Sequence, residues 1–278
     1  MKIDAHHHFW HYNKEEFGWI NDKMSVIRRD FLPSDLLAEI NTAGIDAVVS
    51  VQARQTLQET EQLIKYAQEN EFIKGVVGWL PFCEVDIQKY LEKYSNKSCL
   101  KGLRHVIQDE PDDDFILRED FNLGVSLLKD FGLVYDILIF EKHLPQTIEF
   151  VKKHPNQRFV LDHIAKPKIK KGQLQPWRKH IEELGCFENV YCKISGMVTE
   201  ADLSNWTLEQ LKPYYEIVLD AFGPGQLMFG SDWPVCLCAC KYGQWVETVQ
   251  QLISQLSCSE QDAIMGENAI RAYGLEVN

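Results

Sequence analysis

Residues 46–70 read DAVVSVQARQTLQETEQLIKYAQEN. The first part of this stretch, residues 46–53, is rich in valine and apolar almost throughout, which is typical of a strand covered on both faces. The second part, residues 57–70, carries its apolar residues at helical spacing among charged ones, which predicts an amphipathic helix. We therefore expect this stretch to form one strand–helix unit.

The same alternation runs along the whole chain of 278 residues. The expected strands are residues 2–5, 46–53, 73–80, 100–107, 133–140, 158–164, 190–195 and 226–230. The expected helices are residues 34–43, 57–70, 85–94, 118–131, 143–153, 175–184, 207–222 and 243–256. A short last helix is expected between Asn268 and Gly274, because a glycine is a common helix end.

Eight strand–helix units without a linker between them predict a single domain over residues 1–278, folded as an α/β protein of the (β/α)8 barrel type, with some distortion allowed. A doubly wound open sheet is the alternative. That fold would need a glycine-rich phosphate-binding turn after an early strand, and the sequence has none.

The composition disfavours several classes of partner. The chain has 29 basic and 41 acidic residues, a net charge of −12, which favours a small neutral substrate over nucleic acid or an anionic membrane. No apolar run reaches the roughly 18 residues of a membrane span, and the N-terminus does not resemble a signal peptide. We therefore expect a cytoplasmic protein. Apolar residues on the outer helices could form a contact between two copies, so a homo-oligomer remains an alternative to a monomer.

The eight cysteines follow no regular disulfide framework, which favours free thiols in a reducing compartment. Cys236, Cys238 and Cys240 alternate along the chain, whereas zinc knuckles separate their cysteines by two residues. This spacing favours structural thiols over a metal site.

Catalytic residues of barrel enzymes lie at the carboxyl ends of the strands. The first expected strand ends in Asp4-Ala5-His6-His7-His8. Because residues two apart share one face of a strand, His6 and His8 should point together into the barrel mouth while His7 points away. Two imidazoles on one face suit a transition-metal ion or the polarisation of a carbonyl group.

Asp232 ends the last expected strand, within Gly230-Ser231-Asp232-Trp233-Pro234. A buried carboxylate needs a partner, and His6, His8 and His163 could provide one across the mouth. A helix cap or a salt bridge is the alternative role for Asp232. His163, at the end of the sixth strand, could instead cap a backbone carbonyl.

The remaining strand ends carry candidate substrate-binding residues. Arg104 and Lys193 could bind a carboxylate or stabilise an oxyanion, and a structural ion pair explains either residue equally well. Aromatic rings at a pocket rim suit the apolar face of a sugar, although they can also be packing. These candidates are Trp10, Gln52, Trp79, Arg104, His105, Lys193 and Trp233.

Six motifs occur in order along the chain: DAHHHFW (4–10), GLRH (102–105), LDHIAKP (161–167), KISG (193–196), MFGSDWP (228–234) and ENAIRAYGL (267–275). Together they resemble the amidohydrolase superfamily, specifically its amidohydrolase family 2 branch of sugar-lactone and pyrone-dicarboxylate lactonases, which includes the L-fucono- and L-rhamnonolactonases. The resemblance extends from Met1 to about Leu275.

The resemblance implies that His6 and His8 form the HxH pair of the first strand, that His163 is a third imidazole and that Asp232 activates water. These four residues are also the candidate metal ligands. Two-metal members of the superfamily have a carboxylated lysine on the fourth strand and a histidine on the fifth. This chain has Arg104 there and Asp136 on the fifth strand, so we expect one divalent ion, most naturally zinc, or none.

The expected reaction is hydrolysis of an aldonolactone to its aldonic acid. Asp232 would act as general base and the three imidazoles would polarise the carbonyl, with Arg104 or Lys193 sharing the oxyanion charge. A metal-free route would require a raised pKa at Asp232. Two alternatives remain: a metal-dependent decarboxylase of an aromatic or muconate-like acid, and a sugar-acid binder without catalysis.

Overall fold

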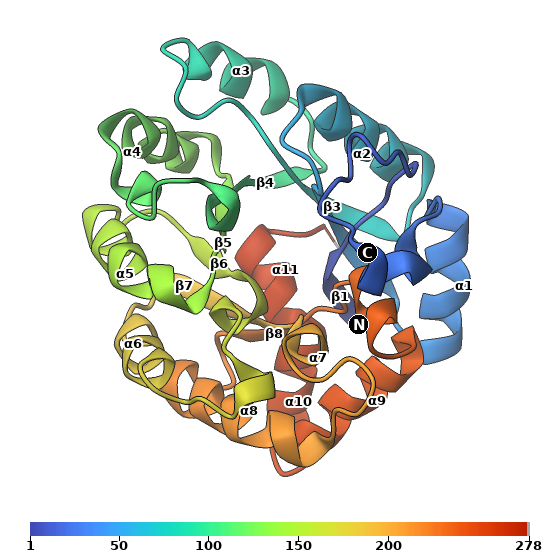
Figure 1. The fold of residues 1–278 in the computed structure, drawn as a ribbon. Coiled ribbons are helices and arrows are strands. Elements are labelled where there is room, and N and C mark those ends of the chain that lie inside the picture. The colour runs from blue at the N-terminus through green and yellow to red at the C-terminus, as the bar shows by residue number, and fades with distance from the viewer. Residues whose placement is uncertain (277–278) are drawn as a thin grey trace.

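The computed structural model describes residues 1–276 and shows a nearly closed barrel of parallel strands surrounded by helices (Figure 1). Each strand pairs with the next one in the sequence, from β1 to β8. The strands are β1 Ile3–His7, β2 Ala47–Val51, β3 Ile73–Gly78, β4 Leu100–Val106, β5 Val134–Leu138, β6 Phe159–Leu161, β7 Val190–Ile194 and β8 Leu227–Phe229. The eight expected strands and the (β/α)8 class are confirmed, except that β6 ends at Leu161 and residues 162–164, expected as strand, form a turn.

The outer helices follow the strands in turn. They are α1 Pro33–Ala43, α2 Leu57–Glu69, α3 Ile87–Tyr94, α4 Glu119–Ser126, α5 Leu144–Lys153, α6 Trp177–Leu184, α8 Leu208–Phe222 and α9 Tyr242–Leu252. Two of their ends show ordinary capping: the Thr56 hydroxyl accepts a hydrogen bond from the backbone of Glu59 at the start of α2, and Gly44 ends α1 with a φ of 69°. The helix expected over residues 118–131 is split, because a 3-10 turn at Leu128–Phe131 follows α4.

Three short helices complete the chain: α7 Met197–Glu200 after β7, and α10 Cys258–Asp262 and α11 Asn268–Tyr273 near the C-terminus. The last one packs against the interior of the barrel. Ala269, Ala272 and Tyr273 belong to one buried cluster with Ile3 and Val134 at the amino ends of their strands. The helix α11 therefore closes the end of the barrel opposite the mouth.

At the mouth, β1 is joined to the chain that follows β8. The backbone N–H of Asp232 donates to the carbonyl of His6 at 2.8 Å, and that of His8 donates to the carbonyl of Trp233 at 2.7 Å. The closure of the barrel thus brings the first and last strand ends side by side.

Among the described residues, no helix combines the length and hydrophobicity needed to cross a bilayer.

The loop after β3 approaches α4 through a glycine. A Cβ added at Gly124 would lie 2.3 Å from the backbone oxygen of Phe82. Phe82 in turn packs against Phe121 and Tyr135, with ring centroids 5.4 and 5.5 Å away. This close approach fixes the distance between α4 and the barrel.

We predict that Gly124→Ala lowers the free energy of unfolding by about 1–3 kcal/mol, because the backbone must shift to admit the methyl group. Gly243→Ala is the matched control, since Gly243 lies in α9 with no atom within 4 Å of an added Cβ. This control should gain up to about 1 kcal/mol from helix propensity. Thermal unfolding of both variants tests the prediction, and equal melting temperatures would contradict it.

Candidate active site

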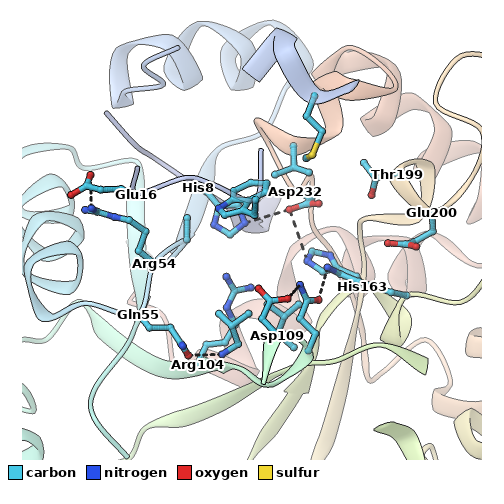
Figure 2. Close-up of a pocket in the computed structure, with 18 of the residues that line it drawn as sticks. His8, Glu16, Arg54, Gln55, Arg104, Asp109, His163, Thr199, Glu200 and Asp232 are labelled. Carbon is cyan, nitrogen blue, oxygen red and sulfur yellow. Dashed lines mark hydrogen bonds and ion pairs between the residues drawn. The ribbon is translucent and has the colours of Figure 1, made fainter. Parts of the chain in front are cut away.

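A cavity of about 680 Å³ opens at the carboxyl end of the barrel. Figure 2 shows Asp232 and His163 facing one another within it, with Arg54 and Glu16 on one side and Glu200 on the other. His8 and Arg104 also line this cavity. The cavity therefore lies where barrel enzymes place their chemistry.

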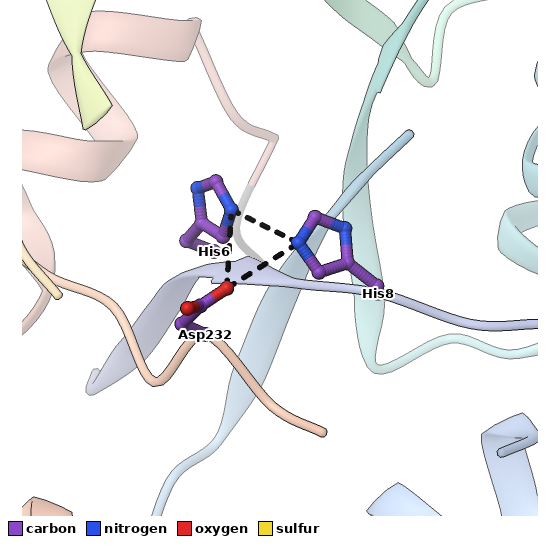
Figure 3. Close-up of side chains that lie close together, drawn as sticks. All are labelled: His6, His8 and Asp232. Carbon is purple, nitrogen blue, oxygen red and sulfur yellow. Dashed lines mark hydrogen bonds and ion pairs between the residues drawn. The ribbon is translucent and has the colours of Figure 1, made fainter. Parts of the chain in front are cut away.

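His6, His8 and Asp232 converge on one point (Figure 3). The Nε2 atoms of His6 and His8 are 3.2 Å apart, and the Asp232 Oδ1 atom lies 3.8 Å from the first and 3.4 Å from the second. His7 points away, with its Nε2 atom 2.9 Å from the Ser50 hydroxyl. The alternation predicted for the first strand is thus confirmed.

The side-chain atoms of His6, His8 and Asp232 that meet here are suited to binding one cation. His8 Nδ1 lies 2.8 Å from the carbonyl oxygen of Val51, which can only accept, so Nδ1 carries a proton and Nε2 is the atom turned toward Asp232. Burial holds the pKa of His6 well below its usual range, so this ring is neutral. Two imidazole nitrogens and a carboxylate oxygen are ligands that zinc prefers, and a carboxylate behind one imidazole, here Asp162, commonly orients such a ligand.

His163 reaches the cavity from an unusual turn. The ring Nδ1 atom lies 2.8 Å from the Ser195 hydroxyl, and Nε2 lies 3.9 Å from Asp232 Oδ1. A Cβ added at Gly196 would lie 2.8 Å from this ring, so only glycine leaves room for it. Burial lowers the pKa of His163 to about 4, which keeps the ring neutral at pH 7.

The pKa of Asp232 differs from the expectation. A metal-free route predicts a raised pKa, and burial acts in that direction. The neighbouring side chains of His163, His8 and Lys166 act against burial, and the pKa of Asp232 is lowered. The raised pKa expected for a metal-free route is therefore not found, because the sequence could not show which side chains surround this carboxylate.

Beneath the cavity lies a network of buried charges. The carboxylate of Asp162 is 2.8 Å from Arg104 Nη1, 2.9 Å from Lys193 Nζ and 3.2 Å from His6 Nδ1. Burial raises the pKa of Asp162, but these three neighbours outweigh it and hold the pKa well below its usual range. Lys193 is also 2.6 Å from Asp136, whose carboxylate accepts from the hydroxyl of Tyr273 in α11.

Both cations expected to stabilise an oxyanion are thus held in ion pairs. Lys193 has no exposed surface and does not line the cavity. Arg104 does line it, but its guanidinium also donates to the backbone carbonyl of Gln52. Of the two roles that the sequence allowed for Arg104 and Lys193, the structure shows both residues in the structural ion pair.

The other candidate substrate-binding residues lie outside the cavity lining. The indole of Trp10 donates to the carbonyl of Arg29, and that of Trp79 donates to His105. His105 stacks on Phe115 and lies 2.6 Å from Glu110. Gln52 and Trp233 are buried, the first against the backbone of Arg104 and the second against Phe31.

Sequence reasoning missed several residues that do line the cavity. Trp19 takes the place expected for another tryptophan: it is 40% exposed and stands edge-on to Trp10 with ring centroids 5.9 Å apart. Lys166 and Glu200 also line the cavity. Of these, only Lys166 lies within a motif already singled out, LDHIAKP.

The cysteines take no part in the site. All eight are free, and Cys236 is buried. Within residues 1–276, the groups of side chains close enough to share an ion contain no cysteine. These groups are His6, His8 and Asp232, and His6, Asp162 and His163.

Comparison with known proteins identifies close relatives. A family model described as amidohydrolase matches residues 3–275. The chain is 37% identical to an L-fucono-1,5-lactonase of Burkholderia multivorans and 32% identical to one of Burkholderia ambifaria. Each alignment covers 99% of this chain and 96% of the relative.

A solved structure shows the same fold with zinc bound. It is an amidohydrolase from Burkholderia multivorans, 37% identical, with a TM-score of 0.96 over 99% of this chain and 100% of that chain. The fold is therefore shared over 99% of this chain.

We predict that Asp162→Asn lowers the free energy of unfolding by about 3–5 kcal/mol, because it leaves two buried cations without their shared carboxylate. Asp220→Asn, on the exposed surface of α8, removes the same charge and should change stability by less than about 0.5 kcal/mol. Denaturant unfolding of the two variants measures the difference. A similar small effect in both would show that the buried network does not stabilise the barrel.

Proposed function

The chain belongs to the amidohydrolase family, and from this premise we propose that it hydrolyses a sugar-derived lactone to the open aldonic acid. The observation that carries the proposal is the convergence of His6, His8 and Asp232 at the mouth of the cavity. The names of the two Burkholderia relatives support the same substrate class. Their lactone, L-fucono-1,5-lactone, is the first substrate to test.

Asp232 is the general base of the proposed reaction. Its carboxylate accepts a proton from a water molecule, whose oxygen attacks the carbonyl carbon of the lactone. When the tetrahedral intermediate collapses, the bond between this carbon and the ring oxygen breaks. The proton held by Asp232 then passes to the ring oxygen, so that the product carries a free hydroxyl and a carboxyl group.

The imidazoles hold the reacting groups in place. His163, oriented by Ser195, faces Asp232 from across the cavity. His6 and His8 are the residues that would hold a divalent ion, which when bound would polarise the carbonyl as a Lewis acid. The two nitrogens and the Asp232 oxygen lie within 4.8 Å of one another, so they can share one ion.

The cavity suits a small neutral ring. Its volume of about 680 Å³ falls within the range of small-molecule sites. Trp19 offers an indole face, and Met24 and Val235 add an apolar wall against which the C–H face of a sugar ring can pack.

The free cysteines fit a protein of the cytoplasm.

We predict that the purified protein releases acid from at least one aldonolactone in a pH-indicator assay. The panel includes L-fucono-1,5-lactone and an L-rhamnonolactone, each measured with the protein as isolated, after chelation and after zinc is added back. Loss on chelation and recovery with zinc assigns an ion to His6 and His8, whereas activity that survives chelation assigns the reaction to the side chains alone. If no lactone is hydrolysed, the proposal fails, and carbon dioxide release from aromatic acids is measured next.

We predict that Asp232→Asn lowers kcat by about 10³-fold or more, because the amide cannot accept the proton of water. The variant should keep its fold, since the backbone N–H of residue 232 still donates to His6. Asp130→Asn, on the exposed surface, is the charge-matched control and should keep full activity. Near wild-type turnover in Asp232→Asn would remove the general base from the mechanism.

A further inference from the structure

Lys166 is a cavity cation that the proposed mechanism does not yet use. Its Nζ atom donates to the side-chain oxygen of Gln108 at 2.7 Å, and it forms no salt bridge with any residue from 1 to 276. The two arginines of the same cavity are already paired, Arg104 with Asp162 and Arg54 with Glu16 at 2.7 Å. Lys166 is thus the cavity cation whose charge is still available to a ligand.

The backbone aims Lys166 at the same space as His163. Residues 163–166 have φ values of 54°, 48°, 61° and 49°, a left-handed turn built without glycine. Such a turn is strained for residues with a Cβ and persists only where the surroundings hold it, often at functional sites. The backbone N–H of Lys166 donates to the carbonyl of His163 at 2.8 Å. This spacing of three residues places both side chains on one side of the turn, and both line the cavity.

The other charges of the cavity make a free cation necessary. Asp232, Glu200 and Asp109 line it, and the chain carries a net charge of −12. Hydrolysis of a neutral lactone leaves a carboxylate in this acidic surrounding. Without a cation nearby, both the oxyanion of the tetrahedral intermediate and the carboxylate of the product would be repelled.

We propose that Lys166 binds the carbonyl oxygen of the lactone and, after ring opening, an oxygen of the product carboxylate. This inference rests on the proposed function and deepens it, because it fixes which end of the substrate lies deepest. The carbonyl carbon sits between Lys166 and Asp232, and the rest of the ring extends toward Trp19 at the mouth. Gln108 holds the ammonium group in place without neutralising it.

The test compares a charged and an uncharged ligand of the same shape. Sodium L-fuconate has the carboxylate that ring opening produces, whereas L-fucitol has a hydroxymethyl group in its place. Calorimetry measures the binding of each to chelated protein, so that no ion can hold the carboxylate. The variants are Lys166→Met, Lys166→Arg and the control Lys170→Met, whose exposed lysine pairs with Asp202 at 3.0 Å.

We predict that wild type binds L-fuconate more tightly than L-fucitol. Lys166→Met should weaken L-fuconate binding by about tenfold or more, the loss expected for a charged hydrogen bond, and weaken L-fucitol binding much less. Lys166→Arg should retain most of the difference, and Lys170→Met all of it. A parallel loss for both ligands would reveal a structural role and overturn the proposal, as would unchanged L-fuconate binding in Lys166→Met.

The same variants separate this inference from the proposed function. If Lys166→Met loses selective L-fuconate binding while wild type hydrolyses no lactone, the carboxylate site stands and the hydrolase proposal fails. If wild type hydrolyses lactones and Lys166→Met keeps both its kcat/KM and its L-fuconate affinity, the reaction stands and the role of Lys166 is wrong.

Discussion

The geometry of the residues at the mouth of this barrel depends on the ion pairs of one carboxylate, that of Asp162. It forms ion pairs with both Arg104 and Lys193 and contacts His6, all within 3.2 Å. Lys193 extends the network to Asp136, and Asp136 accepts from Tyr273 in the helix that closes the opposite end. The orientation of His6 is therefore coupled to the packing of the whole barrel interior. A site built on such a support can hold its imidazoles in one geometry without help from a ligand.

Strained backbone appears where the chain leaves the strands. Residues 163–166 and Asp232 have positive φ values, and none of them is glycine. Glycines occupy positions next to the site residues: Gly196 leaves room for the ring of His163, and Gly230 comes close to His6. The strain is offset by the well-packed barrel beneath and turns side chains from β6 and β8 toward a common centre. The geometry of the site is thus a property of these turns as much as of its residues.

The barrel and the convergence of His6, His8 and Asp232 could be predicted from the sequence, because both follow from strand periodicity and from the closure of eight strands in chain order. Strand alternation separates His7 from His6 and His8, and the position of Asp232 after the last strand places it beside the first. The surroundings could not be predicted in the same way. Trp10 and Trp233 are conspicuous in the sequence, yet they pack behind the strand ends, while Trp19 reaches the cavity from a long loop. The role of Lys166 depends on a left-handed turn that residue propensities disfavour.

In the proposed reaction, water attacks a lactone carbonyl held between Asp232 and Lys166. The most direct measurement is a crystal structure of the Asp232→Asn variant soaked with L-fucono-1,5-lactone. We expect a closed lactone whose carbonyl carbon lies beside residue 232, with the carbonyl oxygen toward Lys166 and the sugar ring toward Trp19. A lactone bound in the reverse sense, with its carbonyl at the mouth and its hydroxyls on residue 232, would rule out this mechanism.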